Sequence, residues 1–140
     1  MDAQFFFTQG IEKFQNRDYL GAIQDYTTAI KLTSGITPGV VTEQIPGGTM
    51  RTNVFNISEG FGEIYFNRGL AYMDIGQYGE AYDDFSKIIE YAPKDAEVYF
   101  KRAVVNYCLE NDDEMEDDLK KAYALDPKYT KEFFERQFQG

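Results

Sequence analysis

The residue types that usually carry catalysis are scarce in this chain of 140 residues. It has no histidine, which excludes a histidine general base and any catalytic triad that depends on one. Its one cysteine, Cys108, has no histidine to activate it, and the glycines show neither P-loop nor dinucleotide-binding spacing. A Glu63–Glu97 pair could do acid–base chemistry if both faced one surface. Carboxylates of so acidic a protein are more often solvated, so the sequence predicts no enzyme and no cofactor.

Six carboxylates in one short run are the remaining candidates for metal chemistry: Asp112, Asp113, Glu114, Glu116, Asp117 and Asp118. The run lacks the central glycine and the ligand spacing of a calcium loop. Acidic residues at the start of a helix are stabilised by the helix dipole and stay solvated. We therefore expect a solvated helix N-terminus and no metal site.

The charge balance excludes several classes of partner. There are 24 acidic residues against 14 basic ones, a formal net charge of −10. Nucleic acids and anionic membranes bind lysine- and arginine-rich surfaces, so neither is expected as a partner. No apolar run approaches the roughly 20 residues that span a bilayer, and the first ten residues lack the features of a secretory leader. With a single cysteine, these observations favour a cytoplasmic protein.

Two consecutive stretches of the chain resemble each other at a spacing of 34 residues. Aromatic, small and proline residues recur at matching places: in Gly62–Asp95 these are Tyr65, Gly69, Tyr72, Gly76, Tyr78, Ala81, Phe85 and Pro93, and in Ala96–Tyr129 they are Tyr99, Ala103, Leu119, Ala122 and Pro127. The apolar residues before and after Gly76 recur at helical spacing, which predicts two helices. Gly76 suits a turn with positive φ between them, and Pro93 should end the second of these helices. A fixed period of this length indicates stacked helical hairpins.

This pattern resembles the tetratricopeptide repeat, and Ala3–Ile36 resembles it as well. The resemblance implies an all-α fold, an array of helical hairpins in a right-handed superhelix with a C-terminal capping helix. We expect one domain over residues 1–140, with repeats at 3–36, 62–95 and 96–129 and a capping helix at 128–139. Residues 35–61 would be an insertion. Its β-prone runs Val40–Ile45 and Met50–Ile57 flank Pro46-Gly47-Gly48, a pattern that favours a β-hairpin, although a surface loop is the alternative.

The resemblance also places certain first-helix positions on a concave surface. The residues implied there form an apolar stripe with a polar asparagine and lysine: Phe7, Ile11, Phe66, Asn67, Leu70, Met73, Phe100, Lys101 and Val104. An exposed stripe of this kind would bind an apolar peptide segment or helix, which would make the chain a non-catalytic adaptor or assembly factor. The alternative is self-coverage, by the insertion, by the C-terminal helix or by a second subunit in a homodimer. The sequence leaves both open.

One subtype of the family can be excluded from the residues. Its chaperone-docking members clamp a C-terminal carboxylate with lysine, asparagine and arginine side chains. Asn67 matches that set and Lys101 could replace its arginine, but Phe7, Ile11 and Glu97 stand where the clamp needs Lys, Asn and Lys. Two lost cations and one added acid would remove the field that binds an anion. We therefore do not expect docking of heat-shock chaperones.

Overall fold

The computed structural model describes the backbone of residues 2–33 and 50–139, with side chains for 2–33 and 62–139. In those ranges the chain is helical, with helices α1 (Ala3–Gln15), α2 (Tyr19–Thr33), α3 (Met50–Asp74), α4 (Tyr78–Tyr91), α5 (Ala96–Cys108), α6 (Asp112–Leu125) and α7 (Lys131–Arg136). The all-α prediction is confirmed. The chain divides into two compact units, Met1–Ala71 and Tyr72–Gly140.

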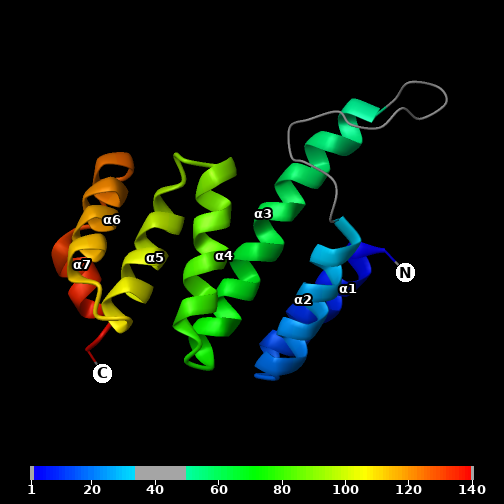
Figure 1. The fold of residues 1–140 in the computed structure, drawn as a ribbon, viewed down its shortest axis with the longest axis horizontal. Coiled ribbons are helices and arrows are strands. Elements are labelled where there is room, and N and C mark those ends of the chain that lie inside the picture. Colours follow the sequence, from blue (N-terminus) through cyan, green and yellow to red (C-terminus); the bar gives the residue numbers. More distant parts are fainter. Residues whose placement is uncertain (1, 34–49, 140) are drawn as a thin grey trace. The chain divides into compact units, whose positions relative to one another are not determined.

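The first unit is built on the helical hairpin of α1 and α2, which pack side by side (Figure 1). Asp2 caps α1 by accepting a hydrogen bond from the backbone N–H of Phe5 at 2.9 Å. The turn between the helices passes through Arg17 at a φ of 64°, and the carboxylate of Asp18 then accepts from the N–H of Gly21 at 3.0 Å. In α3, Ile64 joins the buried cluster of this hairpin, and Arg68 donates to the hydroxyl of Thr27 at 3.2 Å.

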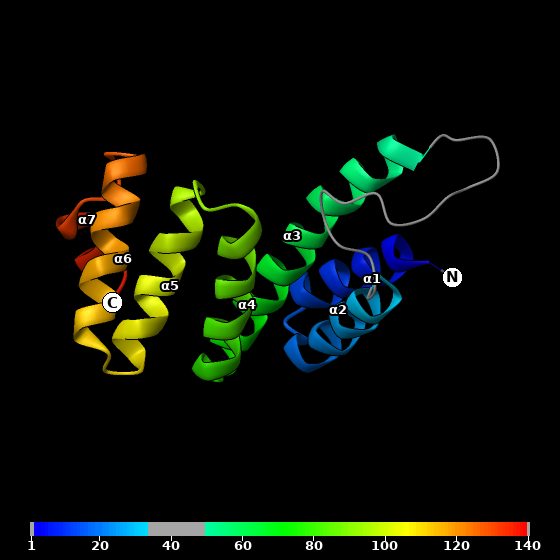
Figure 2. The ribbon, with the colours of Figure 1, turned by 45° about the horizontal axis from the view of Figure 1, so that its top comes forward.

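In the second unit, α4 packs on α5 and α5 packs on α6 (Figure 1). Two turns here lie 34 residues apart and share a left-handed residue, Gly76 at φ 79° and Glu110 at φ 63°. The positive φ expected at Gly76 is confirmed. Helix α4 ends at Tyr91, just before Pro93, as predicted. Figure 2 shows the short α7 running beside α6, after a turn in which Thr130 caps α7 by accepting from the N–H of Phe133.

The predicted strand at Met50–Ile57 is wrong, because α3 already begins at Met50 and continues to Asp74. Helix elongation is cooperative, so extension of an established helix can outweigh the β preference of a few residues. The other half of the predicted β-hairpin, Val40–Ile45, lies outside the described residues. The C-terminal helix is also shorter than predicted, Lys131–Arg136 instead of 128–139.

Candidate functional site

The predicted surface residues of the first unit fall into two classes of burial. Phe7 is 7% exposed and packs on Tyr26, with ring centroids 5.9 Å apart. Ile11 is half-buried against the same cluster. On α3, Phe66, Asn67 and Leu70 are all half-buried. Phe7 therefore serves the core of its own unit, whereas the α3 residues keep part of their surface accessible.

Asn67 has a local partner within α3. Its side-chain amide donates to the backbone carbonyl of Glu63, one turn earlier, at 2.8 Å. This bond leaves the amide oxygen and the second amide hydrogen as groups that could meet a ligand backbone. Glu63 itself is exposed.

Phe100 in the second unit is covered by the chain's own C-terminal segment. It is 3% exposed, and its ring lies 4.8 Å from that of Tyr129, 5.3 Å from that of Phe133 and 6.0 Å from that of Phe134, measured between centroids. The contacts with Tyr129 and Phe133 are edge-on, and such contacts add to the gain from burying the rings. At this position the structure agrees with self-coverage, one of the two alternatives that the sequence left open.

The remaining predicted residues of this unit are Met73, Lys101 and Val104, and all three are half-buried. Val104 packs against the aromatic cluster around Phe100. Burial raises the pKa of the Asp74 carboxyl, and the charge of Lys101 works in the opposite direction. Lys101 is thus close enough to Asp74 for their charges to interact.

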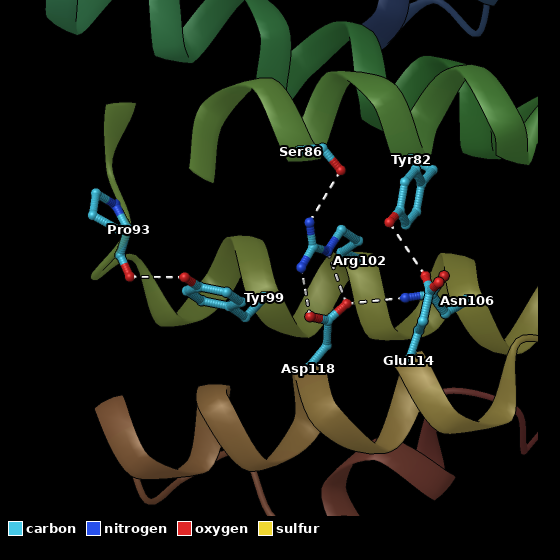
Figure 3. Close-up of polar contacts among 8 residues, drawn as sticks. All are labelled: Tyr82, Ser86, Pro93, Tyr99, Arg102, Asn106, Glu114 and Asp118. Atoms are coloured by element: carbon cyan, nitrogen blue, oxygen red, sulfur yellow. Dashed lines mark hydrogen bonds and ion pairs between the residues drawn. The ribbon is translucent and has the colours of Figure 1, made fainter. Parts of the chain in front are cut away.

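A buried polar network in the second unit is the feature that the sequence analysis missed (Figure 3). The Arg102 guanidinium donates to both carboxylate oxygens of Asp118 at 2.8 Å and to the hydroxyl of Ser86 at 3.0 Å. Asn106, fully buried, donates to the same Asp118 carboxylate at 3.0 Å. The bonds to Asp118 are the main reason that the pKa of Arg102 is raised. Together these bonds tie α4, α5 and α6 to one another.

Two tyrosines complete the surroundings of Arg102. The guanidinium carbon lies 5.4 Å from the ring centroid of Tyr82 and 5.8 Å from that of Tyr99, both within cation–π range. The Tyr82 hydroxyl donates to Glu114 at 3.2 Å and that of Tyr99 to the carbonyl of Pro93 at 3.0 Å. Because Arg102 and Asp118 satisfy each other within the cluster, their bonds hold the helices in place.

The acidic run of α6 is split by this network. Asp118 is only 4% exposed and ion-paired, whereas Asp112, Asp113, Glu114, Glu116 and Asp117 are exposed as predicted. Among the described side chains, no group of three or more cysteine or acidic residues is arranged to hold a metal ion. Nor is any described helix both long and apolar enough to cross a membrane.

Comparison with known proteins identifies the repeat. The family model of the tetratricopeptide repeat matches residues 62–95, the same bounds as the predicted second repeat. The chain contains a tetratricopeptide repeat. The hairpins α1–α2 and α5–α6 lie where the first and third repeats are predicted, and those two assignments stay predictions. Among curated proteins, none matches the chain in sequence.

Solved tetratricopeptide-repeat domains share the fold over nearly the whole chain. The first such domain of Spaghetti (RPAP3), solved with the HSP90 peptide SRMEEVD, is 17% identical, with 99% of this chain and 94% of that chain covered and a TM-score of 0.69. The Arabidopsis OM64 domain is 20% identical, with 96% and 92% covered and a TM-score of 0.69. The C-terminal domain of a candidate FK506-binding protein from Plasmodium falciparum is 19% identical, with 99% and 84% covered and a TM-score of 0.78. At these identities the likeness is one of fold.

Proposed function

We propose that this chain is a non-catalytic protein-interaction module, an adaptor or assembly factor that binds a peptide segment. The observation that carries the proposal is the tetratricopeptide repeat at 62–95, whose first helix keeps Phe66, Asn67 and Leu70 partly accessible. An aromatic and an aliphatic side chain supply apolar contact, and an asparagine beside them can bond a ligand backbone. Related arrays bind peptides, as the Spaghetti domain does with its HSP90 peptide.

The partner of this chain should differ from that acidic peptide. Phe7, Ile11 and Glu97 stand where the family resemblance implies the cations and the amide of a carboxylate clamp. Phe7 is buried and Glu97 is exposed and acidic, so neither could bind an anionic chain end. A segment whose apolar side chains face α3 fits the residues better.

The Phe66→Ala, Leu70→Ala double variant tests this proposal. Affinity capture from the native host with the unaltered chain should recover a partner that the double variant loses, because the apolar contact on α3 is removed. Leu20→Ala is the matched control, since Leu20 is an exposed leucine on α2, 68% accessible, outside the proposed surface. Circular dichroism confirms that each variant is folded. Retention of every partner by the folded double variant would exclude α3 as the binding surface.

Self-coverage has one specific observation in its favour, the aromatic cover over Phe100. A second subunit in a homodimer could also cover the apolar surface. Sedimentation over a concentration series tests for such a dimer. A chain that stays monomeric at every concentration excludes it.

A further inference from the structure

An apolar groove lies in the second unit, between α6 and α7, far along the chain from the α3 residues of the proposed function. We refer to it as the α6–α7 groove. It has a volume of about 640 Å³, and its floor includes Met115, Leu119 and Tyr123 of α6 and Phe134 of α7. Tyr123 is 53% exposed although it carries a large apolar ring. An open groove of this size with an aromatic floor is suited to receive side chains from a partner.

The groove exists because α7 is too short to cover α6. In the same unit α4 packs against the following helix α5, which has 13 residues, and its Ala81 and Phe85 are fully buried. Met115 and Leu119 of α6 lie 34 residues after Ala81 and Phe85, and both are only half-buried. The helix that follows α6 is α7, which has 6 residues and covers less of its neighbour than α5 does. The surface that a full helix covers on α4 is thus partly open on α6.

The partly exposed stripe of Met115, Leu119 and Tyr123 has the dimensions of a helix contact. Met115, Leu119 and Tyr123 recur every four residues, so they lie along one side of α6. Eight residues of helix rise about 12 Å, roughly two turns. An amphipathic helix laid along the groove could place apolar residues against all three, as in helix-in-groove recognition.

The charges at the rim indicate the chemistry of that helix. The groove is lined by Glu116, Glu132 and Glu135 against Lys120 and Lys131, all exposed, on a chain of net charge −10. Two copies of a chain with this net charge repel each other, which disfavours self-association, and the glutamates outnumber the lysines at the rim. A partner with lysines or arginines beside its apolar stripe would meet the glutamates with opposite charge.

We infer that the α6–α7 groove binds a basic amphipathic helix from a partner protein. The helix inserts its apolar side chains against Met115, Leu119 and Tyr123, and its cations face the glutamates of the rim. This surface is distinct from the α3 residues of the proposed function, and a loss of binding at one does not imply a loss at the other.

Two synthetic helical peptides with the same leucine and phenylalanine face test the inference on the full chain. One carries lysines on both flanks of that face, and the other carries glutamates. Fluorescence anisotropy should show binding of the lysine peptide that weakens with added salt, and at least roughly tenfold weaker binding of the glutamate peptide. Absence of binding by the lysine peptide, or equal affinity for both peptides, would overturn the inference.

Variants then locate the site. Tyr123→Ala should weaken binding of the lysine peptide roughly tenfold, as expected for a central aromatic contact. Tyr91→Ala should leave it unchanged, because Tyr91 is a comparably exposed tyrosine on α4, 42% accessible. The Glu116→Lys, Glu135→Lys double variant should weaken binding of the lysine peptide and reduce the salt dependence of that binding. Asp83→Lys on α4, outside the groove, should change neither the affinity nor its salt dependence.

Two outcomes would contradict binding of the basic helix at the α6–α7 groove. If Tyr123→Ala, shown to be folded by circular dichroism, binds the peptide as the unaltered chain does, the groove is not the site. If sedimentation reveals self-association that Tyr123→Ala abolishes, the occupant is a second copy and the inference is wrong. The Phe66→Ala, Leu70→Ala double variant should keep full affinity for the lysine peptide. A failure of this inference can therefore be distinguished from a failure of the proposed function.

Discussion

In the unit Met1–Ala71 the largest fully buried side chain among the described residues is Tyr26, whose ring fills the space that Gly10 leaves on α1. In the unit Tyr72–Gly140 the fully buried side chains include Phe85 and Val105, and buried polar groups lie beside them, namely Asn106 and Asp118, which is ion-paired with Arg102. The first hairpin is therefore positioned mainly by the shape of its apolar core, whereas the second unit adds directed polar bonds to an apolar core of its own. The comparison shows that helical hairpins of one chain can be stabilised by a mainly apolar core or by an apolar core with a buried polar network, and the two should respond differently to substitution.

The largest effect is expected from breaking the ion pair. Arg102→Met leaves Asp118 buried with Asn106 as its remaining partner, and the free energy of unfolding should fall by about 3 kcal/mol or more. Asp118→Leu should cost less, because Arg102 is 20% exposed at its side chain and can reach water. The measurement is urea denaturation followed by circular dichroism.

Two further variants interpret that result. Adding Asp118→Leu to Arg102→Met removes the unpaired charge and should recover most of the loss. Lys87→Met removes the exposed Lys87–Glu90 pair on α4 and should change stability by no more than about 0.5 kcal/mol. A similar loss from Lys87→Met and Arg102→Met would show that burial of the pair is unimportant.

An intermediate effect is expected from adding one methyl group to the first unit. A Cβ at Gly10 would lie only 2.5 Å from Cε1 of the fully buried Tyr26, so Gly10→Ala should lower stability by about 1–3 kcal/mol. The control is Gly79→Ala in α4, where a Cβ would meet nothing within 4 Å. That change should be neutral or stabilise by up to about 1 kcal/mol, since alanine favours helix. Equal effects in thermal unfolding would contradict the close contact.

The smallest effect, and the one that depends on pH, concerns the Tyr26 hydroxyl. It is buried and makes no hydrogen bond to any side chain or backbone group that the structure describes. In the predicted repeat alignment the position of Tyr26 corresponds to Phe85, which is fully buried without a hydroxyl. Tyr26→Phe should therefore raise stability at neutral pH by about 1 kcal/mol.

Burial, and then the charge of Asp25, raises the pKa of Tyr26 from 10.0 to about 12. The folded state thus favours the neutral phenol, and that contribution to stability is complete below pH 10 and lost as pH rises through 12. The difference in stability between Tyr26→Phe and the unaltered chain should widen over this range. A constant difference from pH 9 to 12 would show that the hydroxyl is not buried.

Local signals were sufficient to predict much of the fold. Gly76 sits at positive φ and Pro93 follows the end of α4, and both residues act through their own backbone restrictions. The N-terminal half of α3 was not predicted, because Met50–Ile57 contains β-prone residues and its helical state depends on continuation into the rest of α3. Intrinsic preference is a weak guide where a neighbouring helix can extend.

The candidate site was harder to predict because burial is set by distant segments. Phe7, Phe66 and Phe100 are predicted to share one repeat position, yet of the three Phe66 alone is half-buried. Phe100 is covered by rings that follow it by about 30 residues; the sequence offers the C-terminal helix as a cover but leaves an external partner equally open. Asn106 replaces an aromatic residue of the repeat pattern, and that departure was the one signal of the polar network around Arg102.

The brevity of α7 has a consequence for dynamics. A helix of 6 residues is too short to persist alone in water, so its order depends on the aromatic rings that it lays over Phe100. Local opening of this last segment should therefore be among the easiest fluctuations of the chain, visible as fast amide hydrogen exchange from Lys131 onwards. Each opening would expose the ring of Phe100 to solvent. Exposure of Phe100 and unfolding of α7 would therefore occur together, as one equilibrium.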